Sequence, residues 1–253
     1  MNRLPGVLFP LATGAALLLG WWAASTAHVF PTGTVPNPGE VGAALVDELR
    51  SMRLLTHTLA SLYRVAWGFV VAALMAIGVG LMLSRSVRAR TALLPWINFF
   101  RSLSPIAWIP FAIVWFGLGD PPAIFIIFLS TFFQIALATT AAASSVPKIY
   151  YRVAEDLELS HSEVLFRVTL PAIMPSLITA LRVAIGVAWM VVVAAEMIAR
   201  DSGLGYLILD ARSGLRMDLV VVSMLVIGGI GIGLDLLFSR LTKIDSVRWG
   251  FER

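Results

Sequence analysis

The sequence of 253 residues contains no cysteine, which excludes disulfides, thiolate metal sites and a cysteine nucleophile. Its three histidines, His28, His57 and His161, are too scattered to suggest a metal site. Charged residues are also scarce, at 13% of the chain against about 25% in a soluble domain. Because 58% of the residues are hydrophobic, the composition predicts a polytopic membrane protein.

Motifs of nucleotide binding and catalysis are missing as well. The sequence has no Gly-x-x-x-x-Gly-Lys-Ser/Thr loop, so any ATP hydrolysis must take place on another chain. No Ser/His/Asp set, carboxylate pair or His/Asp/Glu cluster stands out that would support an intramembrane enzyme. The formal net charge is +4, but the basic residues lie mostly between apolar runs, where they set topology rather than bind nucleic acid.

Six long apolar runs organise the chain. They lie at 7–27, 59–83, 93–118, 122–143, 172–199 and 219–238. Each run reaches the ~20 residues that a helix needs to cross about 30 Å of hydrocarbon, and none shows the alternation of a β-barrel strand. The sequence therefore predicts an all-α membrane protein with six transmembrane helices in a single domain, 1–253. The first run is long for a signal peptide and is expected to be a retained helix.

The distribution of Lys and Arg predicts that both termini lie in the cytoplasm. With the N-terminus inside, the eleven inner basic residues are Arg3, Arg85, Arg88, Arg90, Lys148, Arg152, Arg167, Arg240, Lys243, Arg248 and Arg253. The five outer basic residues are Arg50, Arg53, Arg200, Arg212 and Arg216. This excess inside follows the positive-inside rule.

The inner segment 148–167 is charged and amphipathic. Its helical stripe consists of Val153, Leu157, Ser160 and Val164. Pro147 precedes the segment and Pro171 is expected to close the helix. Such a stripe suits a helix that enters a groove on another protein, or a helix that lies in the membrane interface. The residues alone leave both interpretations open.

Motifs along most of the chain carry a family resemblance. The inner segment has Ala154, Leu157, Ser160, Leu165, Arg167 and Leu170-Pro171, and an earlier segment reads Ser104-Pro105-Ile106-Ala107-Trp108-Ile109-Pro110. With these motifs, the sequence resembles permease subunits of the nitrate, sulfonate, taurine and bicarbonate ABC importers. The resemblance implies a MetI-like type I importer permease fold with a cytoplasmic coupling helix in a loop at about 147–170. The residues implied to contact an ATPase subunit are Ala154, Glu155, Leu157, Glu158, Ser160, His161, Arg167 and Pro171.

The same resemblance implies the partners. They are two ATP-binding subunits that carry ATP and Mg, a second permease copy in a homodimer, and an extracytoplasmic substrate-binding protein. The chain itself would bind no cofactor and no nucleic acid, and it would contact lipid in the inner membrane.

Two residues depart from the family's signature loop. Arg152 stands where the family has Glu, and Glu158 stands where it has Gly. Glycine permits a turn that a side chain resists, so the loop geometry or the ATPase surface that it meets is expected to differ.

Polar residues inside the apolar runs are candidates for a substrate pathway, because burying them in a membrane is costly. The predicted pathway residues are Asn98, Arg101, Ser104, Gln134, Arg182 and Glu196. Pro105 and Pro110 follow Arg101 and are expected to open the backbone hydrogen bonds there. Four of the six residues have a structural alternative. Arg101 could reach the inner headgroups, Arg182 could pair with another helix, and Gln134 could serve helix packing. Glu196 lies near the outer end of its helix, where it suits an ion pair with a basic residue or a latch on the outer gate.

The resemblance, with the polar residues in the apolar runs, implies the permease subunit of an ATP-driven importer for a small anion such as nitrate, bicarbonate or a sulfonate of the taurine class. The subunit would couple ATP hydrolysis on its partners to alternating access. Two alternatives remain: a permease of the same family for an uncharged or cationic nutrient such as a vitamin precursor, and a secondary transporter. A secondary transporter would normally show repeats in its two halves, and none is evident.

Overall fold

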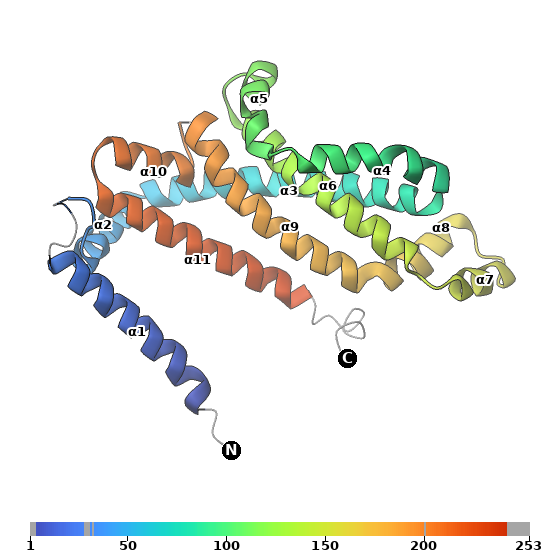
Figure 1. Ribbon diagram of the computed structural model, residues 1–253, viewed down its shortest axis with the longest axis horizontal. Helices are drawn as coiled ribbons and strands as arrows, with labels where there is room; N and C mark the ends of the chain where they lie inside the picture. Colours follow the sequence, from blue (N-terminus) through green and yellow to red (C-terminus); the bar gives the residue numbers. More distant parts are fainter. Residues whose placement is uncertain (1–3, 28–30, 32, 200, 242–253) are drawn as a thin grey trace.

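The computed structural model describes residues 4–27, 31, 33–199 and 201–241, which form helices and no strand (Figure 1). The helices are α1 (Leu4–Thr26), α2 (Pro38–Arg50), α3 (Arg53–Arg85), α4 (Val87–Ser102), η1 (Pro105–Trp108), α5 (Ile109–Phe116), α6 (Asp120–Ser144), α7 (Lys148–Asp156), α8 (His161–Glu163), η2 (Val164–Thr169), α9 (Leu170–Ala199), α10 (Leu204–Ser213) and α11 (Met217–Leu241). The predicted all-α class is confirmed. Figure 1 shows α7 and α8 at one end of the bundle and α2 and α10 at the other; we call these the α7 end and the α2 end.

Four helices in the described part of the chain are long and apolar enough to cross a membrane. They are Arg53–Arg85, Asp120–Ser144, His161–Ile198 and Met217–Leu241. A bent pair of helices, Val87–Ser102 and Pro105–Phe116, could supply a fifth span. α1 is not among these spans, so the predicted count of six is not confirmed.

The third predicted span, 93–118, is not one straight helix. α4 and the η1–α5 segment meet at an angle of 88°. The break has a local cause, because Ser104 precedes Pro105 and a residue before proline is pushed out of the helical region. Leu103 and Ser104 are accordingly extended, at ψ 135° and 125°. α5 then ends at Phe116, and the Gly117 that follows has a φ of +74°, which suits a residue without a side chain.

The helix expected to stop at Pro171 instead continues into the membrane. Residues from His161 to Ile198 form one helix that includes a π-helical stretch at Val164–Thr169. Proline clashes with the carbonyl four residues earlier in a regular α-helix. Because a π-helix is wider, the stretch immediately before Pro171 gives the ring room, and the prediction that Pro171 closes this helix is wrong.

The centre of the bundle is the contact of α3 with α6, which small residues make close. A Cβ added at Gly68 of α3 would lie 2.7 Å from Cβ of Ile127, and one at Gly80 would lie 2.6 Å from Cβ of Thr139. The two glycines therefore set the distance between the helices, and side chains there would push them apart. α9 packs on α6 and also touches α3.

We predict that Gly68→Val and Gly80→Val each lower the stability of the purified protein by about 1–3 kcal/mol, because overpacking forces α3 from α6. Gly78→Val is the matched control, since Gly78 lies on the same helix and a Cβ there meets no atom within 4 Å. Thermal unfolding in detergent would measure the effect. Equal losses in all three variants would contradict the close-packing account.

Candidate functional site

A buried network of charged and polar groups ties four helices together near the α2 end. At its centre, Arg64 of α3 and Glu196 of α9 form an ion pair, with side chains 1% and 0% exposed. The Arg64 Nε also donates to Oδ1 of Asp120, the first residue of α6, at 2.7 Å. Its Nη2 donates to Oγ of Ser202, in the connection between α9 and α10, at 2.6 Å. One guanidinium thus fixes the ends of three other elements.

The carboxylate of Glu196 also accepts hydrogen bonds from groups other than Arg64. Its Oε2 accepts hydrogen bonds from Ser61 Oγ at 2.9 Å and from the backbone N–H of Gly205 at 3.0 Å. The neighbouring Gly203 has a φ of +107°, and a Cβ there would lie only 2.2 Å from Cδ of Glu196. His57 Nδ1 accepts from the Gly203 N–H at 3.0 Å. The connection can fold onto the carboxylate only because glycine allows both the conformation and the approach.

The predicted pairing of Glu196 with a basic residue is confirmed, whereas its place in a substrate pathway stays a prediction. Arg64 is missing from the predicted site residues. The signal was present in the sequence, because Arg64 lies inside the apolar run 59–83 and an ionisable residue in a membrane helix demands a partner.

Arg182 and Asp235 form a second ion pair, between α9 and α11. Arg182 Nε donates to Oδ1 of Asp235 and Nη2 donates to Oδ2, both at 2.6 Å. This two-point geometry is the strongest that arginine and a carboxylate adopt. The side chains are 41% and 51% exposed within this single chain. Arg182 therefore has the structural partner considered for it, and its role in a pathway stays a prediction.

A cavity of about 430 Å³ lies beside the break between α4 and η1. Arg101 and Gln134 both line it, so the fold brings together two of the predicted pathway residues. Asn98 and Ser104 do not line this cavity. Arg182 and Glu196 are engaged in separate ion pairs, so the six predicted pathway residues do not form one site in this chain.

The segment predicted to couple to an ATPase folds as the short helix α7, a turn, and α8, which is the start of the long helix His161–Ile198. α7 ends at Asp156, and Glu158 adopts a left-handed φ of +52°. Ser160 then caps the start of α8, in a capping box in which the side chains of Ser160 and Glu163 accept hydrogen bonds from each other's backbone N–H groups. The predicted stripe through Ser160 and Val164 is wrong, because the chain turns before it reaches them.

Several of the remaining predicted coupling residues lie on the surface of this segment. Ala154 of α7 is buried, whereas Leu157 is 65% exposed. The exposed apolar side chains of α7 and the residue that follows it are Ile149, Tyr150, Val153 and Leu157; we call them the α7 face. Glu155 and His161 line a cavity of about 470 Å³ beneath the segment, together with Arg85, Arg90 and Lys148. Arg167 is exposed, and its Nη1 lies 3.4 Å from Oε1 of Glu163.

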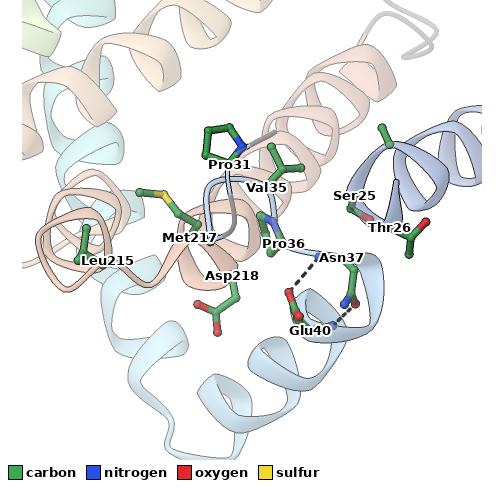
Figure 2. A pocket seen from close by; sticks show the side chains of 12 residues that line it. Ser25, Thr26, Pro31, Val35, Pro36, Asn37, Glu40, Leu215, Met217 and Asp218 are labelled. Atoms are coloured by element: carbon green, nitrogen blue, oxygen red, sulfur yellow. Dashed lines mark hydrogen bonds between the residues drawn. The ribbon is translucent and has the colours of Figure 1, made fainter. Parts of the chain in front are cut away.

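Figure 2 shows a third cavity, of about 470 Å³, at the α2 end between the start of α2 and the start of α11. Its polar side chains already have partners. Asn37 Oδ1 accepts from the Glu40 N–H at 2.9 Å, and Glu40 accepts from the Asn37 N–H at 3.0 Å. Asp218 accepts from Arg216 at 2.7 Å. Among the described residues, no group of three or more His, Cys, Asp or Glu could hold a metal ion.

Comparison with known proteins identifies the family. Residues 68–245 match the family described as the binding-protein-dependent transport system inner membrane component. The chain belongs to this family. It is 33% identical to the bicarbonate transport system permease protein CmpB of Synechococcus elongatus, over 96% of this chain and 90% of that protein. It is 34% identical to the taurine transport system permease protein TauC of Escherichia coli, over 93% and 89% of the two chains.

A solved structure supports the same fold. A chain of the inward-facing MetNI methionine ABC transporter aligns with a TM-score of 0.61, at 17% identity, over 76% of this chain and 97% of that one. The MetI-like importer permease fold that the resemblance implied is therefore confirmed, and the chain is an ABC permease with membrane-spanning helices. At this low identity, the MetNI structure is evidence for the fold alone.

We predict that Arg64→Leu destabilises the permease by about 3–5 kcal/mol, because Glu196 is left as an unpaired buried charge. The matched control is Arg216→Leu, since Arg216 is 57% exposed and its pair with Asp218 lies at the surface. That control should cost less than about 1 kcal/mol. Thermal unfolding and the yield of monodisperse protein would measure both. Similar losses in the two variants would show that the network is not the stabilising element proposed here.

Proposed function

We propose that this permease is the membrane subunit of an ATP-driven importer for a small anion, and that α7 couples it to an ATPase. The exposed α7 face is the observation that carries the proposal. ATP and Mg would be held by two ATPase subunits, because this chain has no nucleotide-binding loop. A second permease copy would complete the pathway, and an extracytoplasmic binding protein would deliver the substrate.

The α7 face has the character of a docking surface. Its members Ile149, Tyr150, Val153 and Leu157 follow the spacing of one helical side. The border of this face is anchored, since Ala154, four residues after Tyr150, is buried against the rest of the permease. An amphipathic helix that is anchored in this way and exposes an apolar face is suited to enter a groove of a partner protein. Aromatic residues such as Tyr150 are favoured at the centres of such interfaces.

Glu158 supports the same proposal from the shape of the segment. The family resemblance places a glycine at this position, and Glu158 adopts the left-handed conformation that a glycine would adopt easily. That conformation costs a residue with a side chain roughly 1–2 kcal/mol. The chain thus keeps the turn between α7 and α8 without the glycine. The altered ATPase surface expected from Arg152 and Glu158 would then involve charge rather than backbone shape.

The substrate is proposed to be an anion on two grounds. The relatives described above are named for bicarbonate and taurine transport. Arg101 also places a positive charge in a cavity beside the broken helix. A cationic nutrient would be repelled by this guanidinium, so the alternative of a cationic substrate is less well supported. Membership of a binding-protein-dependent family likewise disfavours a secondary transporter.

We predict that Leu157→Asp abolishes copurification of the ATPase while the permease still inserts and folds, because Leu157 is largely exposed. Leu49→Asp is the matched control: it is the same change at a leucine 52% exposed on α2, at the opposite end of the bundle. Tagged permease expressed with its ATPase would be purified and the bound ATPase quantified. Undiminished ATPase binding by the Leu157 variant would contradict docking on α7.

We also predict that the α7 end faces the cytoplasm and the α2 end faces outward. The absence of native cysteine allows Ser162→Cys in α8 and Ser51→Cys between α2 and α3 to be tested individually. An impermeant thiol reagent applied to intact cells should label the second position and spare the first until the membrane is opened. Labelling of Ser162→Cys in intact cells would overturn both the orientation and the docking proposal.

A further inference from the structure

The break between α4 and η1 places non-helical backbone beside a cavity within the apolar part of the chain. Leu103 and Ser104 are extended there, and Leu103 lines the cavity of about 430 Å³ together with Pro105. In a membrane, irregular backbone is tolerated only where protein buries it or where it lines a water-accessible cavity. Broken helices of this kind supply ligand groups in other membrane transporters. The break therefore marks the cavity as a candidate binding site.

Two polar side chains that line this cavity have no protein partner. Arg101 forms no ion pair or hydrogen bond within the described part of the chain, and neither does the half-buried Gln134. By contrast, Arg182, which was also predicted to lie away from the loops, and Arg64, which was not among the predicted residues, each have a carboxylate. An arginine within a membrane span costs several kcal/mol unless an anion or water satisfies it. The cavity thus offers one cation and one amide donor to a ligand.

The position of Arg101 along α4 argues against a role at the membrane interface. It lies about 16 Å beyond Arg90 along the helix axis at 1.5 Å per residue. An arginine side chain is shorter than this distance, so the guanidinium does not reach the level of Arg90, at the α7 end of the helix. No Asp or Glu that could neutralise Arg101 is among the residues that line the cavity.

The remaining walls of the cavity are aromatic and aliphatic. Phe100 stacks on Phe133, with ring centres 6.0 Å apart and planes 10° apart, and Trp108 lies 6.4 Å from Phe100. Leu129, Val187 and Val191 extend this apolar wall. Ser130 adds no donor, because its hydroxyl already donates to the Ile127 carbonyl at 2.7 Å. The polar groups are thus few and the apolar area is continuous, as in sites for small organic molecules.

We propose that this cavity is a transit site for an organic oxyanion, a sulfonate or carboxylate with an apolar body. The inference rests on the proposed function as an anion permease and narrows its substrate class. The oxyanion accepts hydrogen bonds from the Arg101 guanidinium and the Gln134 amide, and the apolar body lies against Phe100, Phe133 and Trp108. A bare nitrate or bicarbonate would fill only a small part of about 430 Å³ and leave the aromatic walls in contact with water.

Binding of para-fluorobenzenesulfonate to the purified permease in phospholipid nanodiscs, followed by fluorine NMR, tests the site without the ATPase. We expect the permease to bind this probe, and Arg101→Gln to weaken the affinity at least tenfold. Arg88→Gln is the matched control, because Arg88 is an exposed arginine on the same helix and does not line the cavity. No binding to the unaltered permease, or equal weakening by both variants, would overturn the inference.

The apolar walls are tested by a second pair of variants. Phe100→Ala should weaken binding of the aromatic sulfonate several-fold more than binding of methanesulfonate, whereas Phe99→Ala, at a neighbour outside the cavity lining, should affect neither. Competition by nitrate or bicarbonate as strong as that of the organic sulfonates would overturn the proposed substrate class. These measurements do not depend on ATPase docking. If the cavity does not bind the probe but the ATPase still copurifies, the proposed function stands and this inference falls. If the ATPase does not copurify but the cavity binds the probe, the proposed function falls and this inference stands.

Discussion

A charge placed inside a membrane needs a counter-charge, a water-accessible cavity or a ligand, and this requirement organises the permease. Three arginines lie away from the loops, and each meets this requirement in a different way. Arg64 is fully buried and is satisfied by Glu196, Asp120 and Ser202. Arg182 makes a two-point pair with Asp235 at a partly exposed position. Arg101 has no partner in the described part of the chain and lines a cavity instead. The first arrangement stabilises the fold, and the third leaves a site open.

The helix that runs from His161 to Ile198 connects the two ends of the molecule. It begins beside the α7 face, where an ATPase is proposed to dock. It carries Arg182 midway and Glu196 near its far end, where Glu196 holds the connection to α10. A displacement of α7 and α8 would therefore act on one continuous helix rather than on a chain of loops. The π-helical stretch at Val164–Thr169 is the irregular point along its length, and it lies next to the proposed docking segment.

Much of this architecture could be predicted because it follows from local chemistry. The apolar runs gave the helical class, and the signature motifs gave the family and its fold. The failures have physical reasons. Pro105 and Pro110 indicated an opened backbone in the third span, but the bend of 88° could not be predicted, because a proline can either end a helix at the preceding residue or only kink it. Pro171 is accommodated by a π-helix, which is rare and has no clear sequence signature. The apolar run around Arg64 indicates that this residue is buried. Its partners lie far away in the sequence, so they could not be predicted.

ATP-dependent uptake by the reconstituted complex is the most direct test of the central claim. The permease, its ATPase and its binding protein would be assembled in proteoliposomes, with ATP placed on the side that bears the α7 end. The account predicts uptake of a radiolabelled small anion that requires ATP, the binding protein and this permease together. Uptake driven by an ion gradient without ATP, or uptake that persists when the permease is left out, would contradict it.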